Sequence, residues 1–284
     1  MSDFVFPFIF QNLNIRGRFI YMNNMIDDCF VNHNYPAVIK NIIIKSMLYT
    51  AMMGSLVKIE SIITLQLQND NSLLKLLVSE QYQQKFIRAY CRYDDILNHS
   101  LIDFNTLTDG NLLSITIDPV DTQLNRHQGL IKLSHESFDE GMKDFFTSSE
   151  QSETKVKTAI RFNDKAIENK YEAACLMIQK LPEGGQNNDL EDPWDRIGIF
   201  YETISDDDLF KIAANPKDFL PKIFSEDTVV AFDNENIFYR CRCSNEKILS
   251  ILDQMKITPD AETKIKCEYC GKIYSDFVNS ENLS

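Results

Sequence analysis

The chain has 284 residues, 44% of them hydrophobic and 25% charged, which is the composition of a globular protein with one large core and a small second unit. Its formal net charge of −13 repels phosphate backbones and argues against nucleic acid as a partner. No apolar run is long enough to span a bilayer.

The N-terminus and the cysteine count bear on the compartment. Asp3 and Pro7 interrupt the first ten residues, unlike a secretory signal, which has a basic start and a longer apolar run. Seven cysteines, an odd number with four at metal-binding spacing, fit a reducing compartment better than a disulfide framework. We therefore expect a cytoplasmic protein.

The first half of the chain predicts a mixture of helices and strands. Residues 15–22 are predicted as a strand and 24–32 as a short helix. Proline suits the first position of a helix, so a longer one is predicted to begin at Tyr35-Pro36 and to continue toward Gly54, with apolar residues at three- and four-residue spacing. Alternating patterns then predict strands near residues 63–68, 73–78, 85–92 and 112–118.

Polar turns between these strands indicate antiparallel hairpins, hence an α+β fold rather than a doubly wound one. A helix at 136–149 and strands at 156–162 and 173–181 complete this part. We expect an N-terminal domain of antiparallel sheet with helices at 1–182, a mostly helical acidic linker at 183–230, and a small C-terminal four-cysteine domain at 231–284.

The linker begins at the clearest break in the chain, Pro182-Glu-Gly-Gly185. Residues 183–230 hold 12 acidic and 4 basic side chains, and short helices are predicted at 194–204 and 206–213 before prolines at 216 and 221 interrupt. Apolar residues lie among this charge: Trp194, Ile197, Phe200, Tyr201, Leu209, Phe210 and Phe219. The pattern predicts a segment that docks on the core with marginal stability.

Four cysteines near the C-terminus form two tight pairs, Cys241 and Cys243, then Cys267 and Cys270. The 23 residues between the pairs are enough for a helix at 244–255, capped by Ser244, and a turn that returns the second pair to the first. Four thiolates converging in this way suit tetrahedral Zn²⁺ in a closed site. Structural disulfides and coincidence are the alternatives, and the spacing favours zinc.

The remaining chemistry-bearing residues suggest no catalytic centre. Cys29, Cys91 and Cys175 have apolar neighbours and are expected to be buried. No histidine follows His135, which excludes a cysteine–histidine site built from the last third of the chain. Without a Gly-rich phosphate loop or a Gly-X-Ser-X-Gly motif, we expect neither ATP-driven work nor enzymatic activity.

The order of motifs over residues 8–274 resembles the bacterial redox-regulated heat shock protein 33 family, whose members are ATP-independent holdase chaperones. The resemblance rests on the two cysteine motifs together with the following segments: Arg16-Gly17, Asn34-Tyr35-Pro36, residues 63–68, His127-Gln-Gly129 and residues 145–151.

The resemblance implies a redox switch. Cys241, Cys243, Cys267 and Cys270 would hold one zinc ion in the reduced form, and hypochlorous acid, or peroxide with heat, would form Cys241–Cys243 and Cys267–Cys270 disulfides and release the metal. The C-terminal domain and linker would then unfold and expose surface for unfolding client proteins. The resemblance also implies a homodimer on activation and later handover of clients to ATP-driven chaperones.

The sequence departs from that family in three places. The interval between the cysteine pairs is shorter than usual, His127 stands where tyrosine is common, and the linker is only loosely similar. Two alternatives are a zinc-ribbon adaptor that binds nucleic acid or protein, and a thiol–disulfide oxidoreductase that uses Cys267 and Cys270. The acidic charge argues against the first, and the missing thioredoxin-like βαβ pattern against the second.

Overall fold

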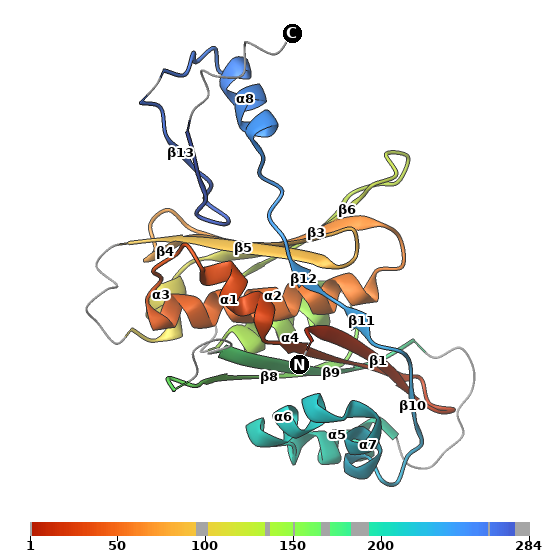
Figure 1. The fold of residues 1–284 in the computed structure, drawn as a ribbon. Coiled ribbons are helices and arrows are strands. Elements are labelled where there is room, and N and C mark those ends of the chain that lie inside the picture. The colour runs from red at the N-terminus through yellow and green to blue at the C-terminus, as the bar shows by residue number, and fades with distance from the viewer. Residues whose placement is uncertain are drawn as a thin grey trace.

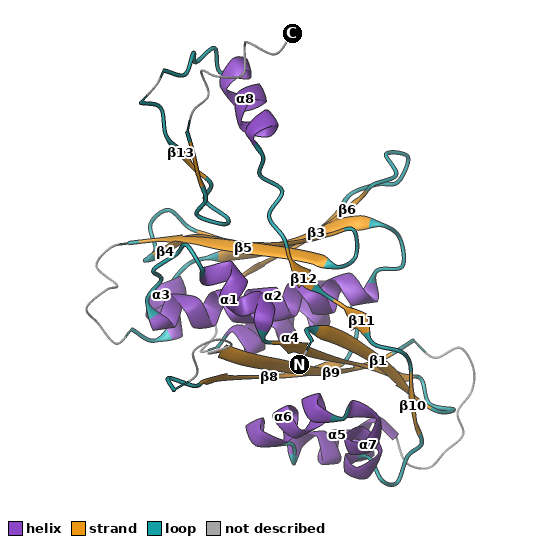
Figure 2. Cartoon of the chain, viewed as in Figure 1, coloured by secondary structure: helices purple, strands orange, loops and turns teal. Residues whose placement is uncertain are grey.

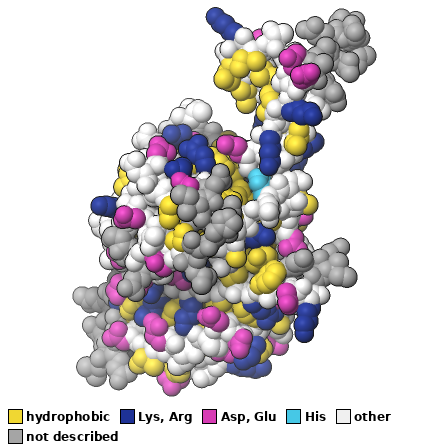
Figure 3. All heavy atoms as spheres, turned by 90° about the vertical axis from the view of Figure 1, so that its left-hand side faces the viewer, with side chains coloured by type: hydrophobic (Ala, Val, Ile, Leu, Met, Phe, Trp, Pro, Cys, Tyr) yellow, Lys and Arg dark blue, Asp and Glu magenta, His cyan; other side chains and the backbone are white. Residues whose placement is uncertain are grey.

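The computed structural model describes residues 2–94, 102–133, 137–149, 151–165, 171–182, 193–260 and 262–275. Two six-stranded sheets lie one above the other with helices between them, and further helices cover the outer face of one sheet (Figure 1). A small C-terminal unit projects from the opposite side (Figure 1 and Figure 3). The predicted α+β class is confirmed, and the strands of its main part are divided between two large sheets (Figure 2).

The first sheet has the strand order β10-β1-β2-β9-β8, and β11 also pairs with β1. All its pairings are antiparallel. Its strands are β1 (Phe4–Phe10), β2 (Ile15–Met22), β8 (Thr154–Phe162), β9 (Tyr171–Lys180), β10 (Val229–Ala231) and β11 (Glu235–Asn236).

The second sheet has the order β12-β5-β4-β3-β6-β7. Its pairings are antiparallel except the short one between β12 and β5, which is parallel. The strands are β3 (Ser61–Gln68), β4 (Leu74–Tyr82), β5 (Phe86–Tyr93), β6 (Leu112–Pro119), β7 (His127–Lys132) and β12 (Phe238–Tyr239).

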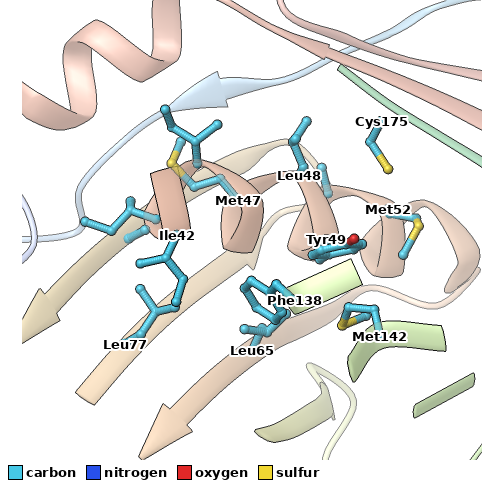
Figure 4. Close-up of a cluster of buried hydrophobic side chains, with 14 of the residues drawn as sticks. Ile42, Met47, Leu48, Tyr49, Met52, Leu65, Leu77, Phe138, Met142 and Cys175 are labelled. Atoms are coloured by element: carbon cyan, nitrogen blue, oxygen red, sulfur yellow. The ribbon is translucent and has the colours of Figure 1, made fainter. Parts of the chain in front are cut away.

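The main core fills the space between the sheets, around α2 (Ala37–Leu56) (Figure 4). This helix is apolar on nearly all sides, as expected for a helix with a sheet on either side of it. The Tyr49 ring of α2 lies 5.2 Å from the Phe138 ring, and Met47, Met52 and Met142 belong to the same buried cluster. The other helices of this part are α1 (Asn24–Phe30), α3 (Phe104–Thr108) and α4 (Phe138–Ser149).

A second apolar cluster lies on the outer face of the first sheet, under α5 (Pro193–Glu202), α6 (Asp206–Ala214) and α7 (Pro216–Ile223). The ring of Phe224 meets that of Phe10 edge-on at 5.0 Å. The buried side chains from these helices include Trp194, Ile197, Tyr201, Leu209, Phe210 and Leu220. The acidic segment is thus docked through the apolar residues that the sequence singled out, although Phe200 and Phe219 are only partly buried.

Of the two interruptions predicted in this segment, the one at Pro216 is confirmed, because α6 ends at Ala214 and α7 begins at Pro216, whereas the one at Pro221 is wrong. Pro216 starts α7 at a position where its missing N–H costs nothing, and Pro221 lies inside the helix. Backbone bonds on either side, Phe219 N to Asn215 O and Phe224 N to Leu220 O, maintain the turn. The predicted break at residues 183–192 falls outside the described residues.

Residues 229–239, which we call the strap, connect the two sheets. The strap pairs with β1 through β10 and β11, then with β5 through β12. Between them, Ile237 is buried in the main core at 2% exposure. The strap therefore runs from the end of the acidic helices to the first cysteine pair. In the part of the chain that the structure describes, no helix is long and apolar enough to cross a membrane.

Candidate metal centre

The C-terminal unit is folded around its cysteines. Helix α8 (Asn245–Gln254) begins after Ser244, whose hydroxyl accepts a hydrogen bond from Lys247 N, as the sequence predicted. Strands β13 (Ile265–Lys266) and β14 (Ile273–Tyr274) then form a hairpin around the second pair. The buried side chains of its apolar cluster are only Ile248, Leu252 and Tyr274 among the described residues. So small a core needs another source of stability.

The structure brings the four predicted cysteines together. Their Sγ atoms all lie within 4.8 Å of one another, with Cys241 at 3.7 Å from Cys267 and Cys243 at 3.4 Å from Cys270. A tetrahedral zinc ion with Zn–S bonds of about 2.3 Å requires sulfurs about 3.8 Å apart. The cluster thus has the size of a four-thiolate zinc site, and the described residues add no histidine or carboxylate to it.

The second pair lies on a tight turn that depends on Gly271. This residue has φ of +67°, in the left-handed region that favours glycine. Its N–H donates to Cys267 O at 2.8 Å, and Cys267 N donates to Lys272 O at 2.9 Å. We call residues 267–271 the knuckle, and its backbone geometry aims both sulfurs at the first pair.

Electrostatics explain why such a cluster needs a cation. Burial and the neighbouring cysteine charges raise the pKa of Cys241 and Cys270 above that of an ordinary thiol. Burial opposes the thiolate of Cys243 too, but hydrogen bonds from the Tyr274 hydroxyl, at 3.0 Å, and from neighbouring thiols lower its pKa overall. A divalent cation among the sulfurs would favour the thiolate form of all four.

The three other cysteines behave as predicted. Cys29, Cys91 and Cys175 are buried, and burial raises the pKa of Cys29 and Cys91 to about 12 and that of Cys175 further. Such thiols are poor nucleophiles and are slow to oxidise. The four cysteines of the cluster are partly exposed, so reagents in water can reach them more readily than the three buried thiols.

The sequence did not predict how the cluster is attached to the rest of the molecule. Tyr274, Arg242 and Tyr269 stand within or beside the cysteine motifs. The Tyr274 hydroxyl donates to Cys243 of the other pair, while Arg242 and Tyr269 contact Glu80 and Arg88 in a much earlier part of the chain. The only local indication of this attachment in the sequence is that Arg242 lies between Cys241 and Cys243 and Tyr269 between Cys267 and Cys270. His127, by contrast, lies in β7 opposite Ile117 and is not part of the cluster.

Known proteins resemble this chain over nearly its whole length. A family model described as "Hsp33 protein" matches residues 3–275. A "33 kDa chaperonin" of Caulobacter vibrioides is 26% identical over 287 residues, covering 96% of this chain and 94% of the relative. One of Salmonella typhimurium is 28% identical over 280 residues, covering 96% and 91%.

A solved structure extends the likeness to the fold. The crystal structure of a 33 kDa chaperonin from Thermotoga maritima matches with a TM-score of 0.75 at 16% identity, covering 96% of this chain and 94% of that one. The arrangement of two sheets, docked helices and a C-terminal four-cysteine unit thus falls within a fold already seen.

Proposed function

This chain belongs to the Hsp33 family, and from that premise we propose that it is a redox-regulated holdase, inactive while its four cysteines hold zinc and active once they are oxidised. The family consists of chaperones and not enzymes, so the expected lack of enzymatic activity is confirmed at the level of the family. Family membership also favours this function over a zinc-ribbon adaptor or an oxidoreductase.

In the resting state, Cys241, Cys243, Cys267 and Cys270 would bind one Zn²⁺ as thiolates. Bound zinc would contribute on the order of 10 kcal/mol to the folding of the C-terminal unit. The fit is supported by sulfurs within 4.8 Å of one another and by the three-residue apolar cluster, which is too small to hold the unit alone.

In activation, Cys241 and Cys243 would join in one disulfide and Cys267 and Cys270 in another. As each S–S bond forms, its two thiolates give up two electrons. With protons from water, these electrons reduce hydrogen peroxide to two water molecules, or hypochlorous acid to chloride and water. The four sulfurs then cease to be thiolate ligands, and the C-terminal unit loses the stabilisation that zinc provided. The nearest sulfurs belong to different motifs, so peptide mapping of the oxidised chain is needed to decide the pairing.

The observation that carries the proposal is the strap, which joins the cluster directly to the acidic helices. Tyr239, at the end of β12, lies two residues before Cys241, while β10 follows α7 after a short turn. Unfolding of the C-terminal unit would free the strap and then the helices, and would uncover the aromatic face of β1. That face is a surface for unfolding client proteins.

We assign residues 1–182 to the chaperone core, 183–230 to the releasable linker and 231–284 to the redox switch. The protein would act in the cytoplasm, where thiols stay reduced. It would form a homodimer on activation and use neither ATP nor nucleic acid. Its partners are unfolding proteins.

Light scattering of a chemically unfolded client tests the function. The oxidised, zinc-free chain should suppress aggregation, whereas the reduced zinc form should not. Zinc content, free thiols and protease sensitivity of residues 183–230 should be measured on the same sample before and after oxidation. Equal suppression by both forms would refute the redox switch.

The ligand assignment has its own test in Cys267→Ser. Loss of one thiolate should weaken zinc binding more than about 100-fold, since losing even an outer hydrogen-bond partner of a ligand costs about 10–100-fold. Cys91→Ala is the matched control, because this cysteine is buried away from the cluster. Competition with a chromogenic chelator measures both, and unchanged affinity in Cys267→Ser contradicts the assignment.

A further inference from the structure

The residues between the cysteine ligands contact one common site on the second sheet. Arg242, between Cys241 and Cys243, places Nη2 at 2.6 Å from Glu80 Oε1. Tyr269, between Cys267 and Cys270, lies with its ring centroid 3.9 Å from the guanidinium carbon of Arg88. Glu80 and Arg88 are themselves paired across β4 and β5 at 3.1 Å. Both halves of the cluster therefore reach the same ion pair.

Glu80 and Arg88 are well shielded from water. Their side chains are 9% and 12% exposed, with Arg242 at 32% over the Tyr82 ring. A shielded carboxylate has lost the hydration that stabilises its charge in water, and nearby cations compensate for that loss. If Arg242 moved away, Arg88 alone would compensate for it only in part. The Glu80 carboxylate thus favours the arrangement in which Arg242 is present.

Hydrogen bonds from outside the C-terminal unit also hold the backbone of the knuckle. Tyr269 O accepts hydrogen bonds from the Tyr239 hydroxyl and from His33 Nε2, each at 3.2 Å. Asn32 Nδ2 donates to Cys270 O at 2.9 Å. The contact is close, since a Cβ on Gly271 would lie 2.6 Å from Asn32 Cβ. The Tyr269 ring also meets Tyr90 at 4.6 Å.

We propose that Glu80, Arg88 and Tyr90 form a docking site for the closed cysteine cluster, with Arg242 and Tyr269 as the two docking side chains. Each docking residue lies between two ligands, so closing the four sulfurs on one centre presents both side chains to the second sheet together. Disulfides within each pair would change the backbone around both residues and end the double contact. The regulatory part of this proposal rests on the proposed function; the docking itself does not.

The docking site would stabilise the closed cluster against opening. Variants of it should therefore release zinc more readily although every ligand is intact. For Tyr269→Ala this behaviour separates a docking role from a general loss of stability, because the substitution lies in the C-terminal unit and leaves every residue of the two large sheets unchanged.

The test compares Tyr269→Ala with Glu268→Ala, its exposed neighbour in the same motif. In the reduced zinc-loaded chain, we expect one zinc per chain in both. Tyr269→Ala should transfer zinc to a chelator about tenfold faster, as expected for loss of a shielded cation–π contact. Amide hydrogen exchange at Arg240, which donates to Ile87 O, should rise in parallel. Tyr269→Phe keeps the ring and should match the parent chain.

Transfer rates and exchange equal to those of Glu268→Ala would overturn the proposal. If Tyr269→Ala does not load zinc, Glu80→Gln on the second sheet carries the test without altering the cysteine motifs, and it should accelerate zinc transfer. Arg242→Ala should then have little further effect in the Glu80→Gln background; full additivity of the two changes would also refute the site. None of these measurements uses a client protein. A negative result in the holdase assay would therefore not affect the conclusion about the docking site.

Discussion

At the scale of single residues, Gly17 shows how closely the first sheet is packed. It lies in β2 opposite Phe8 of β1, and the Phe8 ring covers the place where a side chain would be. A Cβ built on Gly17 would lie 2.0 Å from Phe8 Cζ, and Phe8 is fully buried. Only glycine lets the aromatic ring lie flat over the neighbouring strand at this point.

Gly17→Ala should therefore destabilise the chain by about 1–3 kcal/mol, because a fully buried ring has no free space to move into. Urea unfolding of the reduced zinc form measures the change. The same substitution should cost less in a Phe8→Ala background, where the ring is gone. An equal cost in both backgrounds would show that the ring is not the cause.

At the scale of elements, the acidic helices are held by a few specific contacts besides their apolar side. Arg196 of α5 places Nη2 at 2.5 Å from Oδ1 of Asp227, which lies just before the strap and is 7% exposed. The Tyr201 hydroxyl donates to Leu176 O at 2.9 Å. The Arg196–Asp227 pair thus connects the first linker helix to the segment that leads to the cysteines.

Two substitutions in α5 should shift linker docking in opposite directions. Arg196→Ala removes the cation that pairs with the shielded Asp227 carboxylate, so that its negative charge is less well compensated. This change should weaken docking by about 1–3 kcal/mol. Gly198→Ala should strengthen it by about 0.5–1 kcal/mol, because alanine favours the helix and its Cβ would meet only the flexible end of Lys155, at 3.0 Å.

The fluorescence of Trp194, the only tryptophan, reports both changes, since its ring is 6% exposed in the docked helix. The urea concentration that exposes Trp194 should fall in Arg196→Ala and rise in Gly198→Ala. Shifts of the same sign would contradict this account of α5.

Elements with a strong local pattern could be predicted from the sequence. The β2 strand, α1, α2 and the hairpin of β3 and β4 follow from periodicity and turn residues, and the four cysteines from their spacing. By contrast, β1 was missed because Pro7 and an unbroken apolar run do not resemble an alternating strand. Proline is tolerated at position 7 because β10 pairs with residues 8–10 and β11 with residues 4–5, which leaves Pro7 between the two pairings. Its carbonyl oxygen still accepts a hydrogen bond from Phe232 N.

The short strands β11 to β14, together with β7 and α3, were also missed. The two-residue strands β11 and β12 exist only because β1 and β5, distant in the chain, pair with them, while β13 and β14 pair with each other around the second cysteine pair. Segments this short carry too little local propensity to be predicted. The attachment of the cluster to Glu80 and Arg88 has the same origin. Contacts between residues so far apart in the chain, such as Arg242 with Glu80 and Tyr269 with Arg88, produce no periodic pattern in the sequence.

At the scale of the whole molecule, the strap connects the four-cysteine cluster on one side to the docked helices on the other. Hydrogen bonds follow one another along its length: Phe232 N to Pro7 O and Ile237 N to Asp3 O on the first sheet, then Phe238 N to Lys85 O on the second. Just after the strap, Arg240 N donates to Ile87 O. Opening that starts at the cysteines reaches β12 first and β10 last.

Hydrogen exchange during oxidation should follow this order. Protection of Arg240 and Phe238 should be lost before that of Phe232, and exposure of Trp194 should come last. Peptide-resolved mass spectrometry at successive times after addition of peroxide measures the sequence. Loss of protection at Phe232 before Arg240 would show that release begins at the helices and not at the cluster.

The strap also has a protective role that follows from where it lies. Without it, β1 would become an open edge whose segment, Phe4–Phe10, carries four phenylalanines and no charge. Exposed edges of this composition are templates for intermolecular β-pairing, and Pro7 is the single residue within it that opposes such pairing. A strand suited to capture extended, unfolding chains is equally suited to capture copies of itself. Covering its edge until it is needed keeps the resting protein from self-association.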